Sequence, residues 1–181
     1  MTLVEIKVEN IVASCNLYCS IPLERVAAGS ENAEFNPEQF PGLVLRLPEP
    51  KTANLLFGSG KMVCTGSRSI EDVKRAVGLV KVLLADYGVE FNGEPLIEIQ
   101  NIVSSVKTDL ELNLDRLAYK LEGVEYEPEQ FPGMVFRMIK PKVAILIFST
   151  GRFVVTGAKR IEDVREAFDK LLEKFKEIGE I

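Results

Sequence analysis

The sequence predicts an α+β fold in which two similar halves contribute to one antiparallel sheet. Three observations predict it. The chain contains an internal repeat, the pattern of each half indicates several strands followed by a long helix, and short hairpin-like links join the strands. Strands that precede a helix, with short connections between neighbours, favour an antiparallel arrangement over a parallel one. The 181 residues suffice for one sizeable domain, or for two small halves that share a core.

The repeat has an offset of 91 residues and needs no gap, as Asn10 and Asn101 show. Four pairs of segments share this offset: ENIV at 9–12 with QNIV at 100–103, PEQFPG at 37–42 and 128–133, KMVCTG at 61–66 with RFVVTG at 152–157, and IEDV at 70–73 and 161–164. Two long copies do not make a solenoid. They predict two repeats, 1–91 and 92–181, within one continuous domain of approximate two-fold symmetry.

Each half contains the same elements in the same order. Apolar and polar residues alternate over 4–15, which predicts a strand, and a short helical stretch follows Pro22. Strands over 33–67 lead to a helix over 70–87, for which Ser69 is a suitable N-cap. The second half predicts a strand at 95–106, a short helix at 114–120, strands over 124–158 and a helix at 161–178.

Both faces of the predicted hairpins are apolar. Side chains alternate along a strand, so Leu55 and Phe57 share one face while Leu56 points to the other. In an antiparallel sheet with one solvent-exposed face, apolar and polar residues should instead alternate along each strand. The helices can cover one face, and an uncovered apolar face of this size indicates a binding surface. A fully buried sheet, or a face hidden in a homodimer, is the alternative.

Composition argues against several classes of protein. The chain has no histidine, no G-x-S-x-G segment and no P-loop, so we expect neither an enzyme nor a cofactor. Cys15, Cys19 and Cys64 make a poor zinc site, and we expect buried or incidental thiols.

No apolar run is long enough to span a bilayer, which takes about 20 residues. The N-terminus alternates apolar and polar residues, which indicates a strand and not a signal peptide. We therefore expect no membrane association and an intracellular location, cytoplasmic or, if the source is a eukaryote, nuclear. The net charge of −5 argues against nucleic acid unless the cations are clustered.

The repeated loops supply a reason to expect such clustering. Phe40 and Phe131 directly precede a Pro-Gly pair, which favours a tight turn, and a phenylalanine at a loop tip is badly placed for core packing. Basic residues accompany the loops and hairpins in both halves: Arg46 with Arg137, Lys61 with Arg152, and Arg68 with Lys159. Cations around a symmetric apolar surface suit duplex DNA.

With these motifs in place, the chain resembles the TATA-box-binding protein family in its archaeal form, the duplicated core alone. The resemblance covers nearly the whole chain and includes QNIV, PEQFPG, the basic hairpin ending in TG, and IEDV. It implies a pseudo-two-fold saddle: a ten-stranded antiparallel curved sheet with four helices on the convex face. It also implies a general transcription initiation factor that binds and bends A·T-rich TATA-box DNA through the minor groove, a mode for which this family is a known case.

The resemblance assigns roles by position. The wedges that open base steps are Phe40 with Phe57 and Phe131 with Phe148. The minor-groove hydrogen-bonding groups are Asn10 and Asn101, assisted by Thr65 and Thr156. The apolar floor consists of Val12, Leu55, Val63, Val103, Leu146 and Val154, beside Pro41 and Pro132. The phosphate contacts are Arg46, Lys61, Arg68, Arg137, Arg152 and Lys159.

The resemblance also implies protein partners. Glu127, Glu129 and Gln130 in the second loop are expected to contact transcription factor B, and the complex then recruits the RNA polymerase assembly. A weak homodimer in the absence of DNA is a further expectation. The alternative function is a structural or scaffold protein that uses the apolar sheet face to bind protein.

Overall fold

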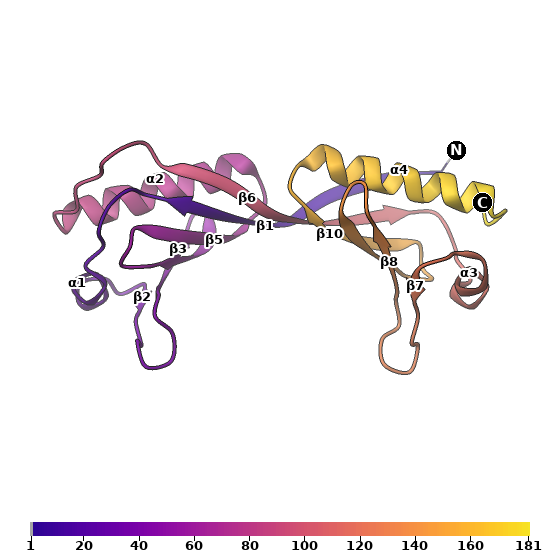
Figure 1. Ribbon diagram of the computed structural model, residues 1–181, viewed down its shortest axis with the longest axis horizontal. Helices are drawn as coiled ribbons and strands as arrows, with labels where there is room; N and C mark the ends of the chain where they lie inside the picture. The colour runs from indigo at the N-terminus through magenta and orange to yellow at the C-terminus, as the bar shows by residue number, and fades with distance from the viewer. Residues whose placement is uncertain (1) are drawn as a thin grey trace. The chain divides into compact units, whose positions relative to one another are not determined.

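The computed structural model describes residues 2–181. Over these residues the chain forms ten strands and four helices (Figure 1). The elements of the first repeat are β1 (Val4–Asn16), α1 (Leu23–Gly29), β2 (Ala33–Glu34), β3 (Leu43–Pro48), β4 (Lys51–Leu56), β5 (Lys61–Ser67) and α2 (Ile70–Asp86). Those of the second are β6 (Leu96–Thr108), α3 (Leu114–Lys120), β7 (Val124–Glu125), β8 (Met134–Met138), β9 (Val143–Ile147), β10 (Arg152–Ala158) and α4 (Ile161–Glu177).

The ten strands form one hydrogen-bonded order, β2-β3-β4-β5-β1-β6-β10-β9-β8-β7. The neighbouring pairs β3–β4, β4–β5 and β5–β1 are antiparallel, and so are β8–β9, β9–β10 and β10–β6. The predicted fold class, a ten-stranded antiparallel sheet with four helices, is therefore confirmed.

The chain packs as two compact units, which do not begin and end with the sequence repeats. Asn10–Gln100 form the first unit; Asn101–Ile181, together with residues 2–9, form the second. β1 thus contributes its first residues to one unit and the rest to the other. The division of the sequence into repeats at 1–91 and 92–181 stays a prediction.

The core of the first unit lies between α2 and the strands. Val73, Val77, Val80 and Leu84 recur every three or four residues along α2 and are buried. This spacing places them on one helix face, which packs against β5. The N-cap predicted at Ser69 is confirmed, because its Oγ accepts a hydrogen bond from the Asp72 backbone N–H at 3.1 Å.

The core of the second unit is aromatic. Figure 1 shows α4 lying along the strands of its own unit. Phe168 and Phe175 of α4 are fully buried, and the Phe168 ring meets the Phe153 ring of β10 edge to face with centroids 4.9 Å apart. Edge-to-face pairs contribute about 0.5–1.5 kcal/mol beyond the area they bury.

In each unit the helix covers only one face of the strands. Met62 and Cys64 of β5 are buried in the core, whereas Val63 and Thr65, which alternate with them, stay partly exposed. The pattern recurs in β10, where Phe153 and Val155 are buried and Val154 is not. The uncovered apolar face expected from the sequence is present, and a fully buried sheet is excluded.

The three thiols are free and buried in the first unit. Burial, reinforced by the neighbouring Cys64 and Cys19, raises the pKa of Cys15 from its ordinary 9.0 to about 11. Burial also raises the pKa of Cys19 and Cys64. Over residues 2–181, no helix is both long and apolar enough to cross a membrane.

Candidate nucleic-acid interface

In the first unit, strand register builds an apolar floor on the face away from α2. Leu55 of β4 lies opposite Val63 of β5 on one side and Val44 of β3 on the other, and Val63 lies opposite Ser14 of β1. Val12 precedes Ser14 by two residues and so points to the same face. These side chains are all partly exposed. They form a continuous, half-exposed surface across four strands.

The second unit repeats this register. Leu146 of β9 lies opposite Val154 of β10 and Val135 of β8, while Val154 lies opposite Ser105 of β6, whose Val103 shares its face. The predicted floor residues of each repeat are thus brought together within one unit. Val44 and Val135, together with Ser14 and Ser105, are floor residues that were not predicted.

An aromatic pair ends each floor. The rings of Phe40 and Phe57 meet edge to face, with centroids 5.8 Å apart and planes at 69°. Phe131 and Phe148 have the same separation and angle. Phe40 and Phe131 are 39% and 40% exposed, so these large apolar side chains remain available for contact. Pro41 and Pro132 beside them are exposed as well.

The glycine of each PEQFPG loop makes room for the rings. A Cβ added at Gly42 would lie 2.7 Å from Cε1 of Phe40 and 3.0 Å from Cε1 of Phe57. At Gly133 the corresponding distances, to Phe131 and Phe148, are 2.8 and 2.9 Å. Neither glycine has a positive φ. The sequence suggested a tight-turn requirement, but the structure shows that these glycines are needed for the close approach of the aromatic pair.

Asn10 is held so that its amide nitrogen remains a donor. The backbone N–H of Gly66 donates to Asn10 Oδ1 at 2.7 Å, and Asn10 Nδ2 donates to Thr65 Oγ1 at 3.3 Å. Because a backbone N–H can only donate, it fixes which end of the amide faces it. The second Nδ2 hydrogen has no partner among the described residues.

Asn101 repeats this arrangement. Gly157 N–H donates to Asn101 Oδ1 at 2.7 Å, and Asn101 Nδ2 donates to Thr156 Oγ1 at 3.3 Å. Thr65 and Thr156 were predicted to assist the asparagines, and the structure places each within hydrogen-bonding distance of its neighbour.

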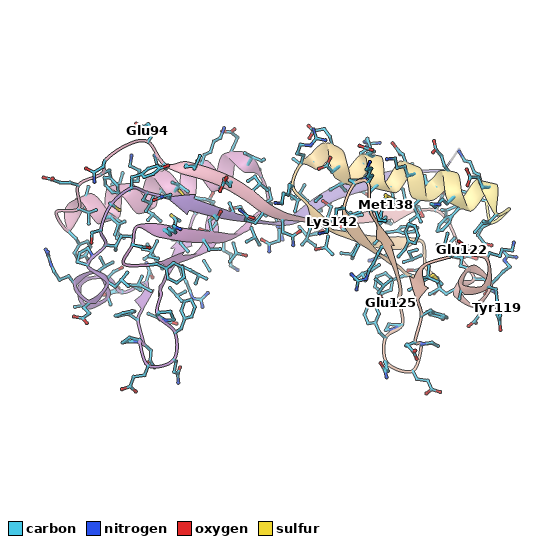
Figure 2. All side chains as sticks on the ribbon, in the orientation of Figure 1. Glu94, Tyr119, Glu122, Glu125, Met138 and Lys142 are labelled. Atoms are coloured by element: carbon cyan, nitrogen blue, oxygen red, sulfur yellow. The ribbon has the colours of Figure 1, made fainter. Side chains whose placement is uncertain are left out.

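The six predicted phosphate-contacting cations are all exposed: Arg46, Lys61, Arg68, Arg137, Arg152 and Lys159. Arg137 Nε forms an ion pair with Glu125 Oε1 at 3.1 Å; Figure 2 labels Glu125. Both side chains of this pair are mostly exposed, and exposed ion pairs contribute only about 0–1 kcal/mol. Arg137 can therefore exchange this carboxylate for a phosphate at little cost.

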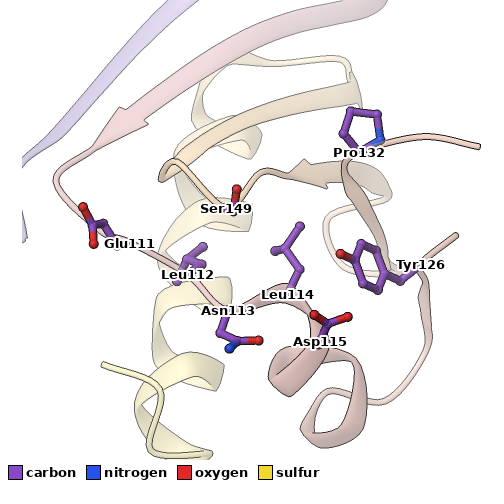
Figure 3. A pocket seen from close by; sticks show the side chains of 8 residues that line it. All are labelled: Glu111, Leu112, Asn113, Leu114, Asp115, Tyr126, Pro132 and Ser149. Carbon is purple, nitrogen blue, oxygen red and sulfur yellow. The ribbon is translucent and has the colours of Figure 1, made fainter. Parts of the chain in front are cut away.

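The predicted partner loop lies beside an acidic hollow. Glu127, Glu129 and Gln130 are exposed, and the loop is closed by hydrogen bonds from the Gln130 and Phe131 backbone N–H groups to Glu127 O, both at 2.9 Å. A hollow of about 470 Å³ lies next to this loop (Figure 3). Its lining residues are Glu111, Leu112, Asn113, Leu114, Asp115, Tyr126, Pro132 and Ser149. Two of the lining residues are acidic: Glu111, which precedes α3, and Asp115 in its first turn.

Two polar contacts on the floor were not anticipated. Ser105 donates to Glu9 Oε1 at 2.8 Å, and Gln100 Nε2 donates to Ser14 Oγ at 2.8 Å. Glu9 and Gln100 directly precede Asn10 and Asn101 in the chain. Ser105 and Ser14 lie opposite the floor valines Val154 and Val63. The match of ENIV with QNIV in the repeat could have indicated the glutamate and the glutamine. No local pattern marks the serines, because their contacts depend on strand pairing.

Comparison with known proteins gives a consistent result. The family model described as "Transcription factor TFIID (or TATA-binding protein, TBP)" matches residues 5–87 and 96–178. The chain is similar to TATA-box-binding proteins of two archaea. It is 52% identical to that of Methanothermobacter thermautotrophicus over 178 residues, 98% of each chain, and 46% identical to that of Archaeoglobus fulgidus over 177 residues, 97% of each.

The solved structure of Methanococcus jannaschii TBP matches with a TM-score of 0.90 and 48% identity. The match covers 96% of this chain and 99% of that one. The family model thus matches both copies of the repeat, and the relatives and the solved structure match along nearly the whole length. The chain therefore belongs to the TATA-binding protein family of transcription factors.

Proposed function

We propose that this protein binds A·T-rich TATA-box DNA in the minor groove, bends it, and recruits transcription factor B and the RNA polymerase assembly. The observation that carries the proposal is the combination of a half-exposed apolar floor with an oriented amide donor in each unit. As a promoter-binding factor, the protein acts with the chromosome in the cytoplasm of an archaeal cell.

Preference for A·T pairs follows from the chemistry of the floor. In the minor groove an A·T pair presents only acceptors, adenine N3 and thymine O2, whereas guanine adds an amino donor. The free Nδ2 hydrogens of Asn10 and Asn101 complement those acceptors. The valines and leucines offer no acceptor to a guanine amino group, which would be left crowded and unpaired against them.

Bending follows from the aromatic pairs. Phe57 and Phe148 project beside the floor, each supported edge-on by the loop phenylalanine, so each pair can enter a base step as a unit. Unstacking a step costs a few kcal/mol, and pyrimidine–purine steps such as TA unstack most easily. The bent duplex brings more surface into contact with the floor and more phosphates to the cations, which offsets that cost.

Recruitment of a partner is supported by local charge. The loop carries Glu127 and Glu129, and the adjacent hollow adds Glu111 and Asp115. In the first loop Asn36 stands where the second has Glu127. A basic surface on transcription factor B would therefore prefer the second loop, and would give the complex a direction that nearly symmetric DNA contacts do not supply.

A pair of gel-shift titrations tests the central proposal. The wild-type protein is titrated, at one stated salt concentration, against a TATA-containing duplex and against the same duplex with G·C substitutions. Tight binding of the first and weak binding of the second are expected. Equal affinity for the two duplexes would contradict the proposal. Failure to bind either duplex would favour a protein-binding role for the apolar face.

A further inference from the structure

A second hollow lies on the floor of the second unit, next to Phe148. It has a volume of about 470 Å³ and opens on the same face as Val154. Its lining residues are Glu5, Lys7, Ser105, Val106, Lys107, Phe148, Thr150, Arg152, Phe153 and Val154. They come from β1, β6, β10 and the turn between β9 and β10, so the hollow depends on strand pairing.

Three cations line this hollow: Lys7, Lys107 and Arg152. All three are exposed, and none forms an ion pair within residues 2–181. Arg152 lies opposite Lys107 in the β10–β6 register, which brings two positive charges side by side. Two carboxylates lie near them: Glu5 lines the hollow, and Glu9 is bonded to Ser105 at its edge. The cations outnumber these acids.

The first unit carries no such cluster at the equivalent positions. The equivalents, 91 residues away, are Glu98 for Lys7, Asn16 for Lys107, Lys61 for Arg152 and Leu96 for Glu5. One cation and one acid therefore stand where the second unit has three cations and one acid. The largest single difference is between Lys7 and Glu98, because this exchange changes the charge by two.

We propose that Lys7 and Lys107 join Arg152 in a binding subsite for the DNA phosphodiester backbone, beside the base step that Phe148 enters. The inference rests on the proposed function and adds two phosphate-binding residues to it. These cations lie next to Phe148, so they would bind the phosphates of the DNA strand whose bases that ring unstacks. The second unit thus binds the DNA backbone more strongly than the first.

This subsite has a measurable signature in the salt dependence of binding. Each neutralised phosphate releases condensed counterions, and contributes about −0.9 to the slope of log affinity against log salt concentration. The double variant K7Q/K107Q should therefore have a slope shallower by about 2. Because phosphate contacts carry no sequence information, its affinity should fall equally for the TATA duplex and the G·C-substituted duplex.

Two further variants make the test specific. K74Q/K176Q removes the same two charges from exposed positions on α2 and α4, and should leave the slope near that of the wild type. E98K places a lysine at the position of the first unit that is equivalent to Lys7, and should steepen the slope by up to about 1. The equivalent of Lys107 is Asn16, but N16K is unsuitable as a test. Asn16 Oδ1 accepts a hydrogen bond from the Tyr18 backbone N–H at 3.0 Å, and a lysine would remove this acceptor.

The outcomes separate this inference from the proposed function. An unchanged slope in K7Q/K107Q, or an equal change in K74Q/K176Q, overturns the phosphate subsite even if the wild type selects TATA DNA. A wild type that binds both duplexes equally overturns the proposed function, while a shallower slope in K7Q/K107Q on either duplex still supports the subsite. Thermal unfolding of each variant at the wild-type temperature confirms that the fold is intact.

Discussion

Gly66 determines what Asn10 can offer to a ligand. Its backbone N–H donates to Asn10 Oδ1 at 2.7 Å, so the amide oxygen is occupied and the amide nitrogen faces outward. Asn101 and Gly157 have the same relationship at the same distance. A donor pointing out of an apolar floor complements the acceptors of an A·T pair. Gly66 and Gly157 thus orient both amides before any ligand binds.

Replacing the amide by a carboxylate tests this relationship. Asn10→Asp keeps the acceptor for Gly66 but removes the outward donor and adds a negative charge near the groove. We expect affinity for the TATA duplex to fall at least tenfold, or about 1.4 kcal/mol. Gel-shift titration measures the loss. Asn113→Asp, at the N-cap of α3, introduces the same charge elsewhere and should leave the affinity unchanged; an equal loss there would contradict the assigned role.

Removing a wedge should reduce bending more than stability. Phe57→Ala deletes a partly exposed ring that packs against Phe40. The free energy of unfolding of the protein should therefore fall by less than the roughly 3–5 kcal/mol typical of replacing a buried phenylalanine with alanine. Fluorescence energy transfer between the duplex ends should report a smaller bend. The control is Phe153→Ala in the core, which should be strongly destabilising. Equal destabilisation by the two variants would mean that Phe57 is a core residue.

The loop glycine offers a subtler test of the same wedge. In Gly42→Ala the added Cβ displaces the Phe40 ring, from which it would lie only 2.7 Å away. We expect a smaller bend in the energy-transfer assay, with the fold retained. Gly78→Ala is the matched control, because no atom lies within 4 Å of its added Cβ. Since Gly78 lies within α2, this change should stabilise the protein by about 0.5–1 kcal/mol and leave bending unaltered.

Charge reversal in the two loops separates partner binding from DNA binding. Glu129→Lys should abolish the supershift caused by transcription factor B while the protein–DNA complex persists. Glu38→Lys, at the equivalent position of the first loop, should leave the supershift intact. If both variants, or neither, lose it, the second loop is not the partner surface.

The buried thiol of Cys15 predicts a loss of stability at alkaline pH. Its folded pKa of about 11 exceeds the ordinary 9.0, so the native state retains the proton longer than the unfolded chain. The resulting stabilisation is fully present below pH 9 and is lost as pH rises through 11, with an upper bound of roughly 2–3 kcal/mol. Urea unfolding of the wild type and of Cys15→Ala across this range should show a steeper decline for the wild type. Parallel curves would contradict the prediction.

Much of the fold could be read directly from the chain. The 91-residue offset, the Ser69 cap and the spacing of Val73, Val77 and Val80 each predict an element that the structure contains. Local patterns succeed here because helix capping and side-chain alternation act over a few residues. The boundaries of the compact units were not accessible in this way, because β1 crosses from one unit to the other.

The sequence by itself determined the repeat, the fold class, the candidate wedges and the cations expected to meet phosphate. Only the tertiary structure decided that Gly42 makes room for a ring, that Gly66 orients Asn10, and that Lys7, Lys107 and Arg152 share one hollow. The Gly66–Asn10 and hollow contacts join residues of different strands, and Gly42 meets Phe57 from beyond the end of β4. Such contacts depend on strand register, which no short segment of the chain specifies.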